Sequence, residues 1–304
     1  MNAVRSTAGA TIRVAGVLSP RLGAAVALPL FGHVARPRAV HADDRSTMDR
    51  ARRSSIRIPG LDRRGVDVTV YEWGAGPDAV VLAHGWTGRA SQFATLVREL
   101  VAEGFRVVAF DAPAHGDTAG RGTYLVDWTD ILAQLAHRYG RLRAVVGHSF
   151  GGLAALVATA HGLDVDRAVT IAAPGDPDLL LAQFQAMLGF DDRTAAALRA
   201  RFARRYFPGE TDPFARLSPL QQSLTAAVPL LAVHDETDPV VPFGELARIA
   251  AVHPDARVVV TRGFGHNRLL TADPVLDAVV AFVSEDRPDR AVTRDERGTV
   301  RRRG

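Results

Sequence analysis

Six short runs of apolar, mostly β-branched residues recur along this chain, and they constrain its fold more than any other feature. They are "AVVLAH" (79–84), "RVVAF" (106–110), "AVV" (144–146), "AVTIAA" (168–173), "PLLAVH" (229–234) and "ARVVVT" (256–261). Runs without polar alternation are typical of strands buried on both faces of a parallel sheet. Helical patterns lie between them, at Ser91–Glu103, Leu125–Tyr139, Phe150–His161 and Pro274–Val283. This alternation predicts an α/β fold with a mostly parallel, doubly wound sheet.

The same pattern divides the chain into parts. About 55 residues separate the runs at 168–173 and 229–234, far more than a crossover needs, which predicts an inserted helical cap at 176–227. The core would then comprise 55–175 and 228–284, and it begins with "SIRI" and "VDVTVYEW", which alternate as an antiparallel pair. We expect a helical, basic segment over 1–54 and a disordered tail over 285–304, which is polar and rich in Arg and Asp.

A lone serine, Ser149, lies in "GHSFGG" (147–152), where an apolar run ends and an Ala- and Leu-rich helix begins. A G-x-S-x-G turn of this kind raises the serine oxygen above the sheet, and Gly147 and Gly151 leave the space that the turn needs. The helix that begins at Phe150 directs its partially positive N-terminus toward any oxyanion that forms there. We therefore predict that Ser149 is a nucleophile. The alternative is a small residue in a tight turn.

Such a serine needs a base and a carboxylate that orients the base. "HDETDPVVP" and "GFGHN" each follow an apolar run, so Asp238 and His266 should meet at the carboxyl edge of the sheet. The chain order Ser149, Asp238, His266 is the one expected for this fold. The alternative for His266 is an ordinary loop or helix-capping histidine.

Three other acids compete with Asp238 for the orienting role: Asp235, Glu236 and Asp176. We favour Asp238 because it precedes Pro239 in the loop, whereas Asp235 is expected to end the strand.

A second oxyanion donor is expected from "AHGWTG" (83–88), through the backbone N–H of Trp86 beside that of Phe150. In this motif His84 is expected to hold the loop in place rather than to act as a base.

A further loop, "FDAPAHGDTAG" (110–120), should be shaped by hydrogen bonds of Asp111, His115 and Gly116. A metal site built from His84, His115, Asp111 and Asp235 would lack a tight ligand spacing. No metal or organic cofactor is expected.

Together these motifs, in this order and spacing, resemble the α/β-hydrolase superfamily over about residues 55–284. The resemblance implies a Ser149–Asp238–His266 triad, an oxyanion hole at Trp86 and Phe150, and a helical cap at about 176–227. Two positions depart from the pattern of many relatives, which carry glycine where this chain has Ala114 and Asp235.

The N-terminal region allows two interpretations. Residues 22–35 are apolar and "AVHA" (39–42) resembles a cleavage site, as in a signal peptide over 1–42. Pro20 and Arg21 interrupt that pattern, and the run is too short to span a bilayer, which favours an amphipathic helix packed on the domain. "ARPR" also resembles an extra helical segment of bacterial family members, which implies a cytoplasmic protein.

The distribution of charge argues against nucleic acid as a partner. Residues 1–58 hold 10 Arg against 3 Asp, and residues 285–304 hold 7 Arg against 5 acids. Because the whole chain has a formal net charge of +4, the remaining residues, 59–284, carry a net charge of −5. No aromatic residues interleave the basic runs as a stacking surface requires.

The apolar stretch 144–163 contains polar residues and glycines that suit a buried strand and helix, so stable membrane insertion is not expected. The absence of cysteine excludes disulfides and a Cys nucleophile.

The predicted function is hydrolysis of a small-molecule carboxylic ester through an acyl-enzyme. Apolar cap residues indicate an apolar acyl pocket, although they could equally pack the cap onto the core: Leu179–Leu181, Phe184, Met187, Leu188 and Phe190. The alternatives are a thioesterase, an amidase or an acyltransferase that uses the same triad, or a non-catalytic ligand receptor on the same fold.

Overall fold

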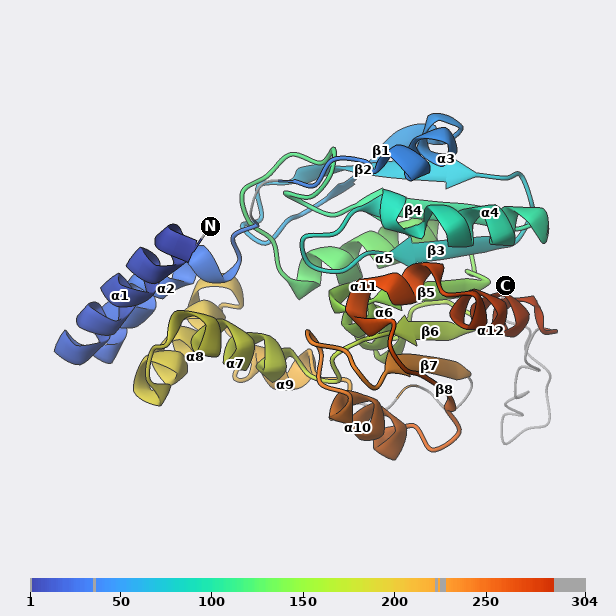
Figure 1. The fold of residues 1–304 in the computed structure, drawn as a ribbon. Helices are drawn as coiled ribbons and strands as arrows, with labels where there is room; N and C mark the ends of the chain where they lie inside the picture. The colour runs from blue at the N-terminus through green and yellow to red at the C-terminus, as the bar shows by residue number, and fades with distance from the viewer. Residues whose placement is uncertain (1, 35–36, 222–223, 225–227, 287–304) are drawn as a thin grey trace, which may run out of the picture.

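One eight-stranded sheet organises the part of the chain that the computed structural model describes, residues 2–34, 37–221, 224 and 228–286. Its order is β1-β2-β4-β3-β5-β6-β7-β8 (Figure 1). The pairs β1–β2 and β2–β4 are antiparallel and the others are parallel. The strands are β1 Arg52–Ile58, β2 Val66–Trp73, β3 Ala79–Ala83, β4 Arg106–Asp111, β5 Ala144–His148, β6 Ala168–Ile171, β7 Leu230–Asp235 and β8 Arg257–Thr261. The predicted α/β fold with a mostly parallel sheet is confirmed.

Helices connect the strands and extend beyond the sheet at the N-terminus. They are α1 Asn2–Leu18, α2 Pro20–Phe31, α3 Arg45–Asp49, α4 Ala94–Ala102, α5 Leu125–Tyr139, α6 Phe150–Ala160, α7 Pro177–Leu188, α8 Asp192–Tyr206, α9 Pro213–Arg216, α10 Gly244–Val252, α11 Gly265–Arg268 and α12 Asp273–Ser284. Short 3-10 turns are η1 Ala42–Asp44, η2 Ala90–Phe93 and η3 Leu269–Thr271. The helix predicted over Ser91–Glu103 therefore begins as the 3-10 turn η2.

Side chains of each central strand alternate between two buried layers. Val81 and Ala83 of β3 face the core beneath α5 and α6, and Val80 and Leu82 face the core beneath α4 and α12. All four are fully buried. Burial on both faces explains why the strand carries no polar alternation.

In the described part of the stretch between β6 and β7, for which the sequence predicts a cap, there are three helices, α7, α8 and α9. The antiparallel hairpin of α1 and α2 packs on α7 and α8 and projects from the same end of the molecule (Figure 1). Phe31 anchors the hairpin, because its ring lies 5.2 Å from that of Phe184 and 5.4 Å from that of Phe202. The predicted division of the chain into an N-terminal segment, a core, a cap and a tail stays a proposal. The predicted tail lies, from residue 287 onward, outside the described residues, as do residues 222–223 and 225–227 of the predicted cap.

None of the described helices is both long enough and apolar enough to cross a bilayer.

Candidate active site

Ser149 occupies a sharp turn between β5 and α6. Its backbone has φ 54° and ψ −122°, and its N–H donates a 2.8 Å hydrogen bond to the Ile171 carbonyl of β6. A non-glycine residue held in this region costs about 1–3 kcal/mol, which the surrounding structure must offset. A Cβ atom at Gly147 would lie 2.2 Å from the Gly151 oxygen, and one at Gly151 would lie 2.1 Å from the Ala83 oxygen. The turn therefore has no room for a side chain at either glycine, as the sequence predicts.

Asp238 and His266, 28 residues apart, meet at the carboxyl edge of the sheet. Asp238 lies in the loop after β7, and His266 lies in the short helix α11 after β8. The His266 Nδ1 donates a 2.8 Å hydrogen bond to Asp238 Oδ2. A proton fixed on Nδ1 leaves Nε2 as the acceptor nitrogen of the imidazole.

The carboxylate of Asp238 is buried and remains ionised. Its side chain is 0% exposed, yet Oδ1 accepts hydrogen bonds from the N–H groups of Val240 (2.7 Å) and Val241 (3.0 Å). Burial by itself would raise the pKa of Asp238, but hydrogen bonds from His234, His266 and these two N–H groups outweigh it and hold the pKa below its usual range. A carboxylate held in this way orients an imidazole and stabilises its protonated form.

His148, the residue before Ser149, links the turn to His266. Its Nε2 donates a 2.9 Å hydrogen bond to the His266 carbonyl, and the two rings lie 4.7 Å apart. Burial, reinforced by the neighbouring His266, lowers the pKa of His148 to about 3, so this ring is neutral at pH 7. Within the described part of the chain, the Ser149 hydroxyl and the His266 ring do not form a hydrogen bond.

Two histidines that support the Asp238–His266 pair were not predicted from the sequence: His148 and His234. His234 Nε2 donates a 3.0 Å hydrogen bond to the Val241 carbonyl and lies 3.5 Å from Asp238 Oδ2. Both stand inside motifs already singled out, "GHSFGG" and "HDETDPVVP". That position was the available signal, since a histidine at the end of a buried strand is an unusual core residue.

Of the four competing acids, Asp238 is the one that contacts His266. Asp235 ends β7 as predicted, and its carboxylate accepts hydrogen bonds from Thr261 Oγ1 (2.7 Å) and from the Phe264 N–H (3.1 Å). Asp235 therefore joins the two loops that carry Asp238 and His266.

The other two acids have separate roles. Glu236 pairs with Arg262 at the surface, 3.4 Å away. Asp176 caps the start of α7 by accepting a 2.7 Å hydrogen bond from the Asp178 N–H.

The loop after β3 lies against Ser149. A Cβ atom at Gly85 would be 2.8 Å from the Ser149 Cβ, and the Trp86 ring packs edge-on at 5.2 Å from the Phe150 ring. Among the described residues, the N–H groups of Trp86 and Phe150 donate no hydrogen bond to another backbone group. His84 holds this loop, because its Nδ1 donates to the Gly85 carbonyl (2.8 Å) and its Nε2 accepts from the Ala112 N–H (3.0 Å).

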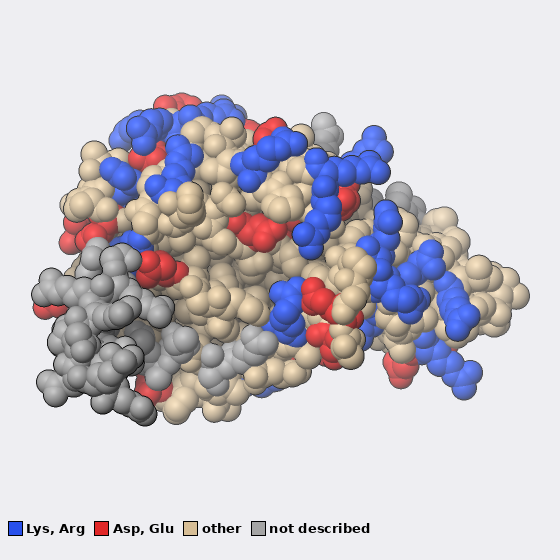
Figure 2. Space-filling model, turned by 180° about the vertical axis from the view of Figure 1, so that it is seen from behind, with Lys and Arg blue, Asp and Glu red and all other residues tan. Residues whose placement is uncertain are grey.

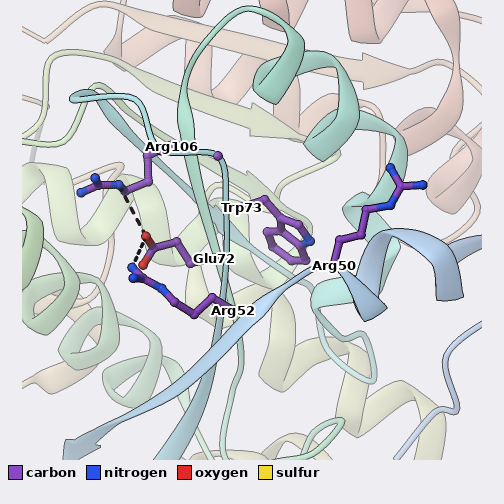
Figure 3. Close-up of a pocket in the computed structure, with 7 residues that line it drawn as sticks. Arg50, Arg52, Glu72, Trp73 and Arg106 are labelled. Atoms are coloured by element: carbon purple, nitrogen blue, oxygen red, sulfur yellow. Dashed lines mark hydrogen bonds and ion pairs between the residues drawn. The ribbon is translucent and has the colours of Figure 1, made fainter.

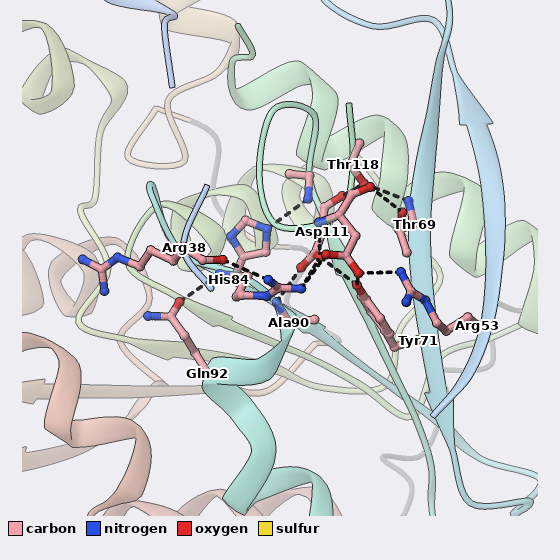
Figure 4. Close-up of polar contacts among 12 residues, drawn as sticks. Arg38, Arg53, Thr69, Tyr71, His84, Ala90, Gln92, Asp111 and Thr118 are labelled. Atoms are coloured by element: carbon pink, nitrogen blue, oxygen red, sulfur yellow. Dashed lines mark hydrogen bonds and ion pairs between the residues drawn. The ribbon is translucent and has the colours of Figure 1, made fainter. Parts of the chain in front are cut away.

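A buried carboxylate, Asp111, fixes the neighbouring loops from behind (Figure 4). It accepts hydrogen bonds from the Ala90 and Asp117 N–H groups, both 2.8 Å, and from the Tyr71 hydroxyl at 2.9 Å. The Arg89 guanidinium lies 3.3 Å away and also donates to the Arg38 carbonyl at 2.9 Å. The network therefore ties the N-terminal segment to the loop that follows Trp86.

Two cavities of the described structure lie away from the predicted catalytic residues. One of about 280 Å³ lies at the opposite, amino edge of the sheet and is lined by Arg50, Arg52, Glu72, Trp73, Gly74, Ala75 and Arg106 (Figure 3). Another of about 360 Å³ is lined by the turn after β1, by α5 and by the end of α8. Across the described ranges, no three His, Asp or Glu side chains are arranged to hold a metal ion.

The apolar residues of the cap are largely committed to packing. Leu181, Phe184, Leu188 and Phe190 are each less than 10% exposed, and the Phe184 ring contacts those of Phe31 and Phe190. Phe184 therefore packs within the protein rather than lining an open acyl pocket. Met187, which is 49% exposed, faces solvent.

Comparison with known proteins gives a family match over most of the chain. The model described as "Alpha/beta hydrolase family" matches residues 80–297. A non-heme haloperoxidase of Rhodococcus erythropolis is 33% identical over 114 residues, which is 36% of this chain and 41% of that protein. A serine hydrolase-like protein of Dictyostelium discoideum is 26% identical over 115 residues, 35% of this chain and 32% of its own length. The chain thus spans less than half the length of these curated relatives.

Solved structures share the fold over a larger part of the chain. An esterase from Pyrococcus furiosus is similar with a TM-score of 0.58 and 22% identity, and the match covers 82% of this chain and 98% of that one. A bromoperoxidase from Bacillus anthracis is similar with a TM-score of 0.55 and 20% identity, over 76% of this chain and 100% of that one.

Proposed function

Because this chain belongs to the alpha/beta hydrolase family, we propose that it hydrolyses carboxylic esters of small molecules through an acyl-enzyme on Ser149. The observation that carries the proposal is the buried Asp238–His266 pair, 2.8 Å from Nδ1 to Oδ2, beside the strained turn of Ser149. We further propose a cytoplasmic location, which the resemblance of the N-terminal segment to that of bacterial family members supports.

The proposed reaction has two halves that use the same groups. In the first, Ser149 Oγ attacks the ester carbonyl carbon while His266 Nε2 accepts its proton. The N–H groups of Trp86 and Phe150 stabilise the oxyanion, and His266 returns the proton to the departing alkoxide as the C–O bond breaks. In the second, His266 accepts a proton from water as the water oxygen attacks the acyl carbon. The bond from that carbon to Ser149 Oγ then breaks, His266 returns the proton to Oγ, and the carboxylic acid is released. Asp238 stabilises the protonated imidazole in both halves.

The lack of a hydrogen bond between the Ser149 hydroxyl and the His266 ring is compatible with this proposal. Catalytic hydrogen bonds in unliganded enzymes are often long and shorten only when substrate binds. His148 supports the geometry, since its hydrogen bond to the His266 carbonyl couples the serine turn to the base.

A fluorophosphonate probe followed by peptide mass spectrometry tests the nucleophile. We expect labelling at Ser149 and its loss in Ser149→Ala, while Ser55→Ala, an exposed serine on β1, keeps both labelling and turnover. His266→Ala should lower kcat/KM for a short p-nitrophenyl ester by at least about 10³-fold without unfolding the chain. Turnover retained in either site variant would contradict the mechanism. Labelling without turnover on ester, thioester and amide panels would favour a receptor.

A further inference from the structure

Exposed apolar side chains are concentrated on the α1–α2 hairpin. Six large hydrophobic residues there are between 36% and 88% exposed: Val14, Val17, Leu18, Leu22, Val26 and Leu30. In the rest of the described chain the corresponding residues are scattered, at Met187, Val240, Phe243, Val258 and Val260. A concentration of this kind on one element marks an interaction surface rather than ordinary surface composition.

On each helix these residues share a face that points away from the cap. In α1, Val14, Val17 and Leu18 are exposed, while Gly9, Ile12 and Gly16 are buried against the cap and α2.

In α2 the same division holds. Leu22, Val26 and Leu30 recur every four residues and are exposed, whereas Ala24 and Ala27 are buried. The hairpin is therefore apolar on both sides. One side is used for packing on α7 and α8, and the other has no protein partner in the described structure.

Positive charge surrounds this apolar surface. Residues 1–42 contain five arginines and no acid, and Arg13 and Arg21 are exposed. The helix α8, which packs along α2, holds five arginines against one acid, Asp192. Its exposed arginines are Arg193, Arg201, Arg204 and Arg205.

These arginines are not neutralised by carboxylates. Within the described ranges, none of the six exposed arginines on α1, α2 and α8 forms an ion pair shorter than 4.0 Å. Figure 2 shows the consequence: the end of the molecule that carries the hairpin is largely uncharged, with arginines grouped beside it.

We propose that the outer face of the α1–α2 hairpin binds the surface of a lipid bilayer that contains anionic headgroups. Apolar side chains would enter the boundary of the acyl chains, and the arginines would contact the phosphates, as in other interfacial helices. A second copy of this chain suits the surface less well, because self-association would bring together the same arginines, which form no ion pair with a carboxylate. The hairpin packs on the cap, so docking would bring the cap side of the molecule to the membrane. This inference does not depend on the proposed reaction.

Vesicle flotation of the full chain tests the proposal. We expect the protein to float with vesicles of phosphatidylcholine and phosphatidylglycerol at 7:3, to float far less with pure phosphatidylcholine, and to be released by 0.5 M NaCl because salt screens the arginines. The double change Val17→Asp with Leu18→Asp should lower the partition coefficient by more than about tenfold. Arg21→Glu with Arg193→Glu should lower it by about fivefold or more for each arginine.

A matched control carries the same chemical change elsewhere. Val258 and Val260 are 45% and 47% exposed on β8, at the end of the sheet order, and Val258→Asp with Val260→Asp should leave vesicle binding unchanged. Light scattering without vesicles covers the competing occupant. A stable dimer that the Val17→Asp and Leu18→Asp pair dissociates, with no binding to anionic vesicles, would overturn the proposal. Equal binding to neutral and anionic vesicles, or equal loss in the control, would overturn it as well.

Discussion

At the scale of single residues, the candidate site depends on the absence of side chains around Ser149. The β5–α6 turn packs so tightly that a Cβ atom at Gly147, Gly151 or Gly85 would lie within 3 Å of another atom. For Gly147 and Gly151 the nearest atoms are backbone oxygens, which cannot rotate away as a side chain can. The strain of the serine conformation is therefore maintained by close packing.

Gly151→Ala should destabilise the protein by more than about 2 kcal/mol, because overpacking against immobile neighbours typically costs about 1–3 kcal/mol or more. The methyl group would meet the Ala83 oxygen at 2.1 Å. Urea unfolding at pH 7 measures the change. The control is Gly244→Ala at the start of α10, where nothing lies within 4 Å, and this change should be neutral or stabilising by about 0.4–1 kcal/mol. Equal midpoints for the two variants would contradict the packing argument.

The sequence motifs identified the candidate catalytic residues but not all of the residues that form hydrogen bonds with them. Asp238 and His266 each follow a buried strand, and the rule that strand ends share one edge was enough to predict their meeting. The supporting contacts of His148 and His234 depend on how loops fold back, which spacing along the chain does not encode. Ala114, noted as a departure from glycine, has φ 65°, so its backbone does adopt the left-handed conformation that favours glycine.

At the scale of elements, regular amphipathic pattern determined which helices could be predicted. The helix α5 has the predicted bounds, Leu125–Tyr139, because large apolar residues form its buried stripe. The helix α1 was predicted only as part of a helical segment over 1–54 and its bounds were missed, since its buried face consists of Gly9, Ile12 and Gly16, which do not form a recognisable apolar stripe. Helix α10 was also missed, although Leu246 and Ile249 have helical spacing and are buried.

The small residues of the hairpin permit close approach to α8, and this contact can be tested by paired substitutions. A Cβ atom at Gly16 would lie 2.6 Å from Thr194 Oγ1, a buried and β-branched side chain with little freedom to move. Gly16→Ala should therefore loosen the hairpin, even though alanine favours an isolated helix by up to about 1 kcal/mol. Adding Thr194→Ala removes the clashing oxygen and should restore most of the packing.

Limited trypsin digestion measures this loosening through the rate of cleavage at the arginines of residues 1–42. We expect Gly16→Ala to be cleaved several times faster than the unmodified chain, and the double variant to fall between them, as expected for coupled neighbours. If the two changes simply added, with the double variant cleaved fastest, the direct contact would not be what holds the hairpin.

At the scale of the whole molecule, strand order is the feature that sequence pattern leaves open. The apolar runs identify strands, but nothing in them specifies that β4 lies between β2 and β3. That order depends on long-range pairing and on the handedness of crossovers. The result is a sheet whose carboxyl edge collects several buried histidines, His84, His115 and His148, each at the end of a strand or in the loop that follows one.

These buried histidines should make the fold sensitive to acid. Burial lowers the pKa of His84 to about 4 and the pKa values of His115 and His148 to about 3, from an ordinary 6.5. Below pH 6.5 the unfolded chain binds protons that these folded histidines do not, so stability is lost as pH falls. Asp127 acts in the opposite sense: burial raises its pKa to about 7, so its protonation favours the folded state as pH falls from 7 toward 4.

The three large histidine shifts should outweigh Asp127 and the smaller upward pKa shifts of other carboxyl groups, Asp44, Asp130 and Asp178. The urea midpoint of the unmodified chain should therefore be lower at pH 4.5 than at pH 7. Asp127→Asn removes the opposing carboxylate whose pKa is raised most and keeps an acceptor oxygen for the Thr123 hydroxyl, which donates a 2.6 Å hydrogen bond to Asp127. The variant should lose stability more steeply over the same pH interval, and urea titrations at pH 7, 5.5 and 4.5 compare the two slopes. A variant whose slope is equal or shallower would show that Asp127 is ionised in the folded protein at pH 4.5, against the effect of its burial.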